Sequence, residues 1–232
     1  GARQPADRPE GALDAPARIE LAARWSAAHP GHAPDQSPLL RRWLRAMWAV
    51  GGPLSRAGIP PDALSAAGAG AARFAVLLAR RPSRAARLGA VAALLASGVA
   101  DGLDGAVAIH SRQWDARVAW RGKAVDRAAD RVADICWAWT IRECGAPRWA
   151  AAGLASAAVA QEAARDLLGE RVRGVATASE RPTRLICATI AAAAAAAAPR
   201  RRWPARVCAG VWGASAVIAA GQLASAARAA RR

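Results

Sequence analysis

Long apolar stretches dominate the chain, and short polar segments rich in proline or glycine separate them. Each stretch is close to the roughly 20 residues that a helix needs to cross a bilayer. Breakers such as Pro61, Pro82 and Pro199 mark the boundaries. The pattern predicts an all-α integral membrane bundle of six transmembrane helices. The expected spans are residues 61–79, 88–110, 122–141, 149–167, 184–198 and 204–227.

An amphipathic segment precedes these spans. Between residues 38 and 57, apolar side chains such as Trp43 and Met47 alternate with basic ones such as Arg45, which is typical of a helix lying in the membrane interface. The residues before it mix Pro, Gly, Asp and Arg without a sustained period. We therefore divide the chain into a disordered or loosely structured polar tail (1–37), an interfacial helix (38–57) and a six-helix transmembrane domain (58–232).

The charge of the chain narrows the choice of partner. The formal net charge is +16 and the sequence pI is about 11.7, which suggests either nucleic acid or an anionic membrane. The arginines lie between apolar stretches, and the 10 tryptophans are suited to the level of lipid headgroups, so we expect membrane lipid and no nucleic acid as partner. The tryptophans are interpreted as anchors in this belt. The four cysteines show no metal-ligand spacing and are expected to be buried free thiols.

Four aspartates supply the candidate chemistry. Asp101 and Asp104 are three residues apart and Asp126 and Asp130 are four apart, so each pair shares one helix face. The pairs lie on consecutive spans near the same turn, where their mutual repulsion favours a hard divalent cation. Alternatively, they form ordinary salt bridges with Arg112, Arg127 and Arg131. Asp134 continues the series a turn deeper, where we favour a structural pair with an arginine.

The spacing of these residues resembles that of the CDP-alcohol phosphatidyltransferases of class I. Their signature reads D-x2-D-G-x2-A-R, a spacer, then G-x3-D-x3-D. Within this family, the chain resembles an actinobacterial-like member. The matching positions are Asp101, Asp104, Gly105, Ala108, Gly122, Asp126 and Asp130. The chain departs from the signature at Ile109, where the family has arginine, and in a spacer that is longer by about one helical turn.

The resemblance implies a role for each matching residue. Asp101, Asp104, Asp126 and Asp130 would hold Mg²⁺ or Mn²⁺, and Asp130 would also act as general base. Gly105, Ala108 and Gly122 would line the CDP moiety, and Gly102 is expected to leave room for the same ligand. The implied reaction transfers a phosphatidyl group from CDP-diacylglycerol to an alcohol and releases CMP. The family also implies a homodimer. The amphipathic segment and the basic tail favour a cytoplasmic N-terminus, so we expect a multi-pass protein of the inner (plasma) membrane whose active site faces the cytoplasm.

A basic cluster between the fourth and fifth expected spans is the candidate acceptor site. Arginine binds phosphate bidentately, so a phosphorylated polyol such as glycerol 3-phosphate or inositol phosphate is the expected acceptor. A loop facing the lipid headgroups is the alternative interpretation. The candidate acceptor residues are Arg173, Arg181 and Arg184.

Two other functional classes remain open at this stage. The basic composition alone is compatible with a nucleic-acid-binding protein, and the aspartates are compatible with an ion path through a transporter or scaffold. His110, at the end of the second expected span, has no partner at a defined spacing and is interpreted as a packing or interfacial residue.

Overall fold

The computed structural model describes residues 38–111, 116–172 and 174–231. Within these residues all regular secondary structure is helical, which confirms the all-α prediction. The predicted polar tail at 1–37 lies outside the described residues. The elements are α2 (Pro38–Arg56), α3 (Pro61–Ala79), α4 (Arg84–His110), α5 (Ala116–Glu143), α6 (Arg148–Leu168), the 3-10 helix η2 (Gly169–Val172), α7 (Arg181–Ala197) and α8 (Trp203–Ala229).

Local sequence signals account for several helix boundaries. Pro60 is extended and Pro61 opens α3, where its missing N–H would have no helical partner. The Ser83 Oγ accepts a hydrogen bond of 3.1 Å from the Ala86 N–H and so caps α4. The turn between α5 and α6 contains Gly145 at φ +123°, a conformation that side chains rarely adopt.

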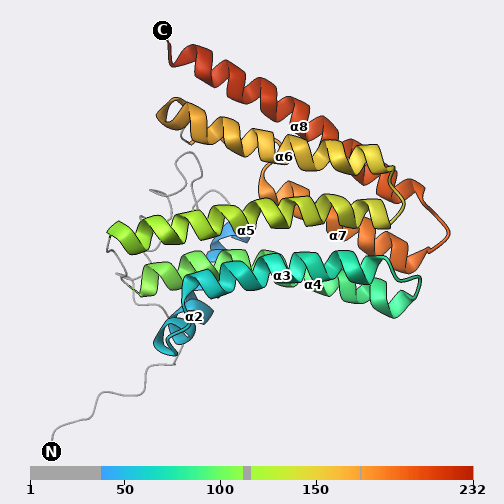
Figure 1. Ribbon diagram of the computed structural model, residues 1–232, viewed down its shortest axis with the longest axis horizontal. Coiled ribbons are helices and arrows are strands. Elements are labelled where there is room, and N and C mark those ends of the chain that lie inside the picture. Colours follow the sequence, from blue (N-terminus) through green and yellow to red (C-terminus); the bar gives the residue numbers. More distant parts are fainter. Residues whose placement is uncertain (1–37, 112–115, 173, 232) are drawn as a thin grey trace, which may run out of the picture.

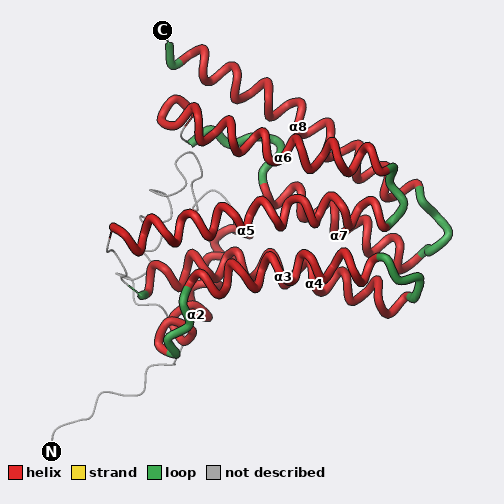
Figure 2. The backbone as a smooth tube through the Cα atoms, in the orientation of Figure 1, coloured by secondary structure: helices red, strands yellow, loops and turns green. Residues whose placement is uncertain are grey.

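The helices α3 to α8 run roughly along one common direction and alternate in sense, whereas α2 lies across them (Figure 1). α3 packs against α4 and α5, α7 packs against α4 and α5, and α6 and α8 form an adjoining pair. In Figure 2 turns lie at both ends of the bundle, and the loop before α7 reaches the middle of its length. We call the end where α3 and α5 begin and α6 and α8 end the aspartate end. The opposite end, with the turns 80–83, 144–147 and 198–202, is the far end.

The core is built mostly from alanine, which lets the helices approach closely. Two large side chains fill its centre, because Trp137 is 1% exposed and Trp212 is fully buried. The prediction that the tryptophans anchor the membrane interface is therefore wrong for these two residues. Trp149 and Trp203, by contrast, are largely exposed at the far end, as an interfacial belt requires.

Three of the described helices are long and apolar enough to cross a membrane, namely α3, α4 and α8. Their outward faces carry exposed apolar side chains such as Phe74, Leu95 and Val217, a surface that water would not favour. These helices indicate a membrane protein. Of the six spans predicted from the sequence, three therefore have the length and hydropathy that crossing a membrane requires. α7 has only 17 residues, and α5 carries a charged face.

α2 lies against α4, and small residues allow the contact. A Cβ atom added at Gly102 would meet the Met47 Sδ atom at 3.0 Å, and one at Gly51 would meet the Ala106 Cβ atom at 2.8 Å. Gly102 is therefore small for helix packing, and the expectation that it makes room for a ligand is wrong. The His110 ring packs against the Trp48 ring, with the ring centroids 3.9 Å apart and the planes tilted by 41°, in keeping with the packing role expected for His110.

Candidate metal centre

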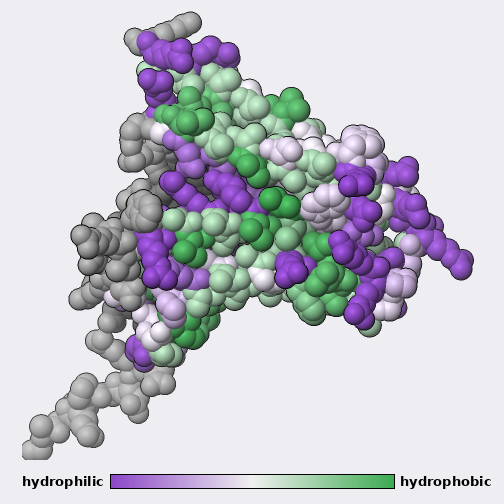
Figure 3. Space-filling model, viewed as in Figure 1, coloured by the Kyte–Doolittle hydropathy of each residue, from purple (hydrophilic) through white to green (hydrophobic). Residues whose placement is uncertain are grey.

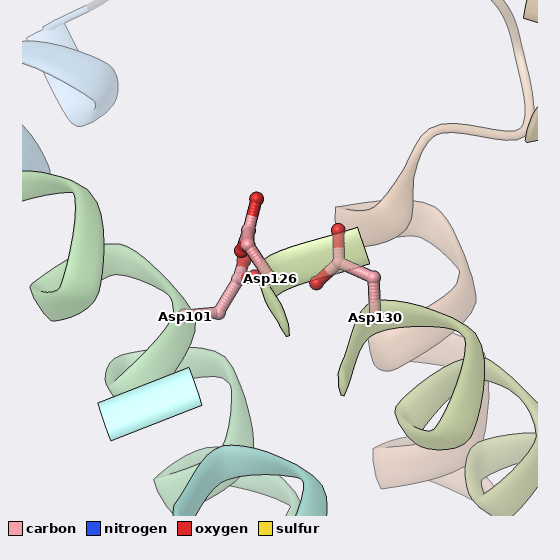
Figure 4. Close-up of side chains that lie close together, drawn as sticks. All are labelled: Asp101, Asp126 and Asp130. Carbon is pink, nitrogen blue, oxygen red and sulfur yellow. The ribbon is translucent and has the colours of Figure 1, made fainter. Parts of the chain in front are cut away.

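Three aspartates converge inside the bundle, about midway along α5. Asp101 comes from the second half of α4, and Asp126 and Asp130 come from consecutive turns of α5. One carboxylate oxygen from each lies within 4.8 Å of the other two. Figure 4 shows the three side chains meeting across the space between the two helices. α4 and α5 are consecutive helices that run in opposite directions, and the helical spacing of the aspartates then brings the three together, as the sequence predicts.

Asp104 lies beside these three residues, but its carboxylate has partners of its own. The Ser65 Oγ on α3 donates a hydrogen bond of 2.6 Å to Asp104 Oδ2, and the Gly105 N–H lies 2.6 Å from Asp104 Oδ1. Asp104 is 7% exposed. The structure thus brings together three of the four expected ligands and holds the fourth against α3.

Arg181 occupies the position of a cation at this site. Its guanidinium forms ion pairs with Asp101, at 3.4 Å, and with Asp130. It also lies 5.2 Å from the centroid of the Trp137 ring, where the aromatic face attracts a positive charge. The cavity left beside these groups measures about 10 Å³, roughly the room of one water molecule. Arg181 must therefore move before a larger ligand can reach the aspartates.

Arg184, expected at the acceptor site, is instead fully buried one turn further along α7. Its Nη1 donates to Asp134 at 2.6 Å, its Nη2 donates to Glu162 at 3.1 Å, and its Nε donates to the Ser179 carbonyl oxygen. The structural arginine pair predicted for Asp134 is confirmed. Arg184 links α5, α6 and α7 and leaves no donor at the surface for a substrate.

The remaining expected site residues occupy open positions or lie outside the description. A Cβ atom at Gly105 would meet nothing within 4 Å, and one at Gly122 would lie 3.6 Å from the Asp62 Oδ1 atom. Ala108 is exposed on α4. These three positions border the aspartates and leave space for a ligand. Arg173 lies outside the described residues.

The sequence left open a second interpretation, in which the aspartates form salt bridges with nearby arginines, and the structure pairs two of these arginines differently. Arg127 and Arg131 both pair with Asp166 on α6, at 3.3 Å and 3.6 Å, rather than with the converging aspartates. Arg112 lies outside the described residues. The neutralising charge at the aspartates comes from Arg181, which is remote in sequence.

Sequence reasoning missed Thr177 and Arg165, which hold Glu180 next to the site. Glu180 accepts hydrogen bonds from the Thr177 N–H, at 2.7 Å, and from the Thr177 hydroxyl, and it pairs with Arg165. This network shapes the segment that leads into Arg181. Ser65 was missed as well, because its partner Asp104 is 39 positions away and no local pattern joins them.

The donor set of the three aspartates fits a hard divalent cation. Carboxylate oxygens are the preferred ligands of Mg²⁺ and Mn²⁺. Opposite oxygens around Mg²⁺ lie about 4.2 Å apart, so oxygens within 4.8 Å need only small side-chain rotations to bind one ion.

Comparison of the chain with protein-family models, curated proteins and solved structures finds no match.

Proposed function

We propose that the protein is a metal-dependent membrane enzyme that transfers a phosphatidyl group from CDP-diacylglycerol to an alcohol and releases CMP. The observation that carries the proposal is the convergence of Asp101, Asp126 and Asp130 from two helices. The intervals from Asp101 to Asp104 and from Asp126 to Asp130 resemble the two halves of the family signature, although the spacer between the halves is longer. The meeting of carboxylates from both halves is what that chemistry needs. The three apolar helices favour this membrane activity over nucleic-acid binding.

In this proposal Asp101, Asp126 and Asp130 hold Mg²⁺ or Mn²⁺. The bound ion would neutralise the pyrophosphate and so stabilise the departing CMP. Gly105 and Gly122 border the aspartates without side chains, which allows the nucleotide to approach the backbone. Ala108 adds only a methyl group on the same side.

Asp130 is the proposed general base. Its carboxylate would take the proton of the acceptor hydroxyl as the hydroxyl oxygen attacks the β-phosphorus of CDP-diacylglycerol. The bond between that phosphorus and the bridging oxygen breaks, and CMP leaves with the electron pair. Asp130 forms an ion pair with Arg181, the proposed acceptor-binding residue, and this contact supports the assignment.

Arg181 is the proposed acceptor-binding residue. Once it leaves the aspartates, its planar guanidinium can pair with the phosphate of a polyol phosphate. When Arg181 moves away, the carboxylates lose its positive charge, and the bound metal ion would replace that charge. Arg184 is fully buried and supports the helix that carries Arg181.

We further propose six spans, with α5, α6 and α7 crossing beside α3, α4 and α8. α7 exposes Ile186 and Ile190 on its outer face, as contact with lipid requires. Asp130 and Asp134 on α5 form ion pairs with Arg181 and Arg184 on α7, so these carboxylates would not face acyl chains. The aspartate end would then face the cytoplasm, where CDP-diacylglycerol headgroups and soluble polyols meet.

The decisive experiment supplies purified protein with radiolabelled CDP-diacylglycerol, Mg²⁺ or Mn²⁺ and a panel of polyols and polyol phosphates. CMP and a new phospholipid are the expected products, and a chelator should stop their formation. Asp130→Asn should lower the rate by about 100-fold or more, the usual contribution of a general base. The matched control is Asp166→Asn, which removes a carboxylate paired with Arg127 and Arg131 outside the site and should retain turnover. Full activity of Asp130→Asn would exclude the proposed mechanism.

A further inference from the structure

A long apolar groove lies between α6 and α8, away from the aspartate site. Its volume is about 1140 Å³. Small residues such as Gly153, Ala157, Gly210 and Gly213 form its floor, and Leu154 and Leu223 add apolar walls. Because one of the two helices is apolar enough to span a membrane, hydrocarbon is the medium that this groove would meet.

The groove is amphiphilic along its length. It extends from Trp149 and Arg206 at the far end to Leu168 and Ala224 near the aspartate end. Arg206 is the one charged side chain among the described residues that line it, and it stands at one end only. The polar Gln161 is buried, and its amide N–H groups donate to Thr177 and to the Ser179 carbonyl oxygen.

The end that carries Arg206 has the character of a headgroup layer. Trp149 is 78% exposed and Trp203 is 59% exposed at this level. In Figure 3 hydrophilic surface gathers at the far end, on the right, beside apolar surface along the helices. In the segments 80–87, 142–148 and 200–206, Glu143 is the only acidic residue. The basic residues of these segments are Arg80, Arg81, Arg84, Arg87, Arg142, Arg148, Arg200, Arg201, Arg202 and Arg206.

We propose that this groove binds a diacyl phospholipid with an anionic headgroup. The acyl chains lie along the small residues between α6 and α8, and the headgroup phosphate pairs with Arg206. Charge complementarity selects this occupant, since an apolar channel with one cation at its end matches an amphiphile with one anionic end. A second copy related by a twofold axis along the helices would set Arg206 against its own counterpart, which the like charges oppose.

Native mass spectrometry of the full chain in detergent tests the proposal. Phosphatidylglycerol and phosphatidylcholine with identical acyl chains are added, and the lipid retained by the protein is counted. We expect phosphatidylglycerol to be retained about fivefold better, the preference that one arginine near a headgroup provides. Arg206→Ala should remove that preference, whereas Arg228→Ala, at the other end of α8, should keep it. Equal retention of the two lipids by the unaltered protein would overturn the proposal.

A second pair of variants tests the place of the acyl chains. Added Cβ atoms at Gly153 and Gly210 would meet nothing within 4 Å, so Gly153→Leu and Gly210→Leu fill the groove without disturbing the fold. Both should reduce retention of both lipids severalfold. Gly221→Leu is the matched control, because Gly221 also faces open space on α8 but does not line the groove. If the filled variants retain lipid fully, or instead convert a dimer into a monomer, the groove is not the lipid site.

Discussion

At the scale of single residues, Arg181 is the residue that most constrains how the site works. It competes with any divalent cation for Asp101 and Asp130. We expect Arg181→Ala to bind Mn²⁺ about tenfold more tightly without substrate, the effect of removing one charge-assisted contact from a part-buried site. Isothermal titration calorimetry of the protein in detergent measures this change directly.

Controls distinguish competition at the site from a general effect of charge. Arg80→Ala removes one positive charge and one ion pair at the far end, with Glu143, and should leave Mn²⁺ affinity unchanged. Arg181→Lys keeps the charge and should remain close to the unaltered protein. Weaker Mn²⁺ binding by Arg181→Ala would show that Arg181 supports the site instead of competing for it.

At the scale of helices, the buried Arg184 joins α5, α6 and α7 through Asp134 and Glu162. Arg184→Met should destabilise the bundle by about 3–5 kcal/mol, because it leaves the Asp134 carboxylate buried without its partner. The double variant Arg184→Met with Asp134→Leu should recover much of that loss, since apolar pairs often replace buried ion pairs without cost. Thermal unfolding followed by circular dichroism gives the comparison.

Equal losses in the single and double variants would mean that the pair contributes by shape and not by charge. An exposed ion pair shows how small the loss of stability is when the charges are in contact with water. Loss of the Arg80–Glu143 contact, where the Arg80 side chain is 58% exposed, should cost no more than about 1 kcal/mol.

The helices differ in how far the sequence could predict them. Proline and glycine signals set the boundaries of α3 correctly, and the spacing of Asp126 and Asp130 on one face correctly predicts their meeting with Asp101. The buried faces could not be predicted, because helices made of alanine are apolar all round and give no period. Trp137 and Trp212 therefore looked like interfacial residues. The partners of Asp134 and Asp104 are 50 and 39 positions away, and only the folded chain brings them together.

At the scale of the whole molecule, the number of spans determines which side of the membrane each turn occupies. If only α3, α4 and α8 cross, the turn at Arg200 lies on the same side as Gly58 and the C-terminal Arg231 lies opposite. If all six helices cross, Arg200 lies opposite Gly58, and Arg231 lies on the same side as Gly58. The two topologies therefore predict reversed labelling of these positions.

Single cysteines at these positions, labelled in intact cells with a membrane-impermeant maleimide, separate the two topologies. Native cysteines interfere little, since burial raises the pKa of the Cys144 thiol to about 12 and so keeps it from forming the reactive thiolate at neutral pH. Cys187 and Cys208 are buried, and Cys136, which is half-buried, is replaced by alanine. We expect Arg200→Cys to react from outside, and Ala57→Cys, next to Gly58, and Arg231→Cys to react only after permeabilisation. Labelling of Arg231→Cys from outside, with Arg200→Cys protected, would support three spans. With three spans, the aspartates would lie on the same side of the membrane as Arg200. In that topology α5, α6 and α7 would lie outside the bilayer.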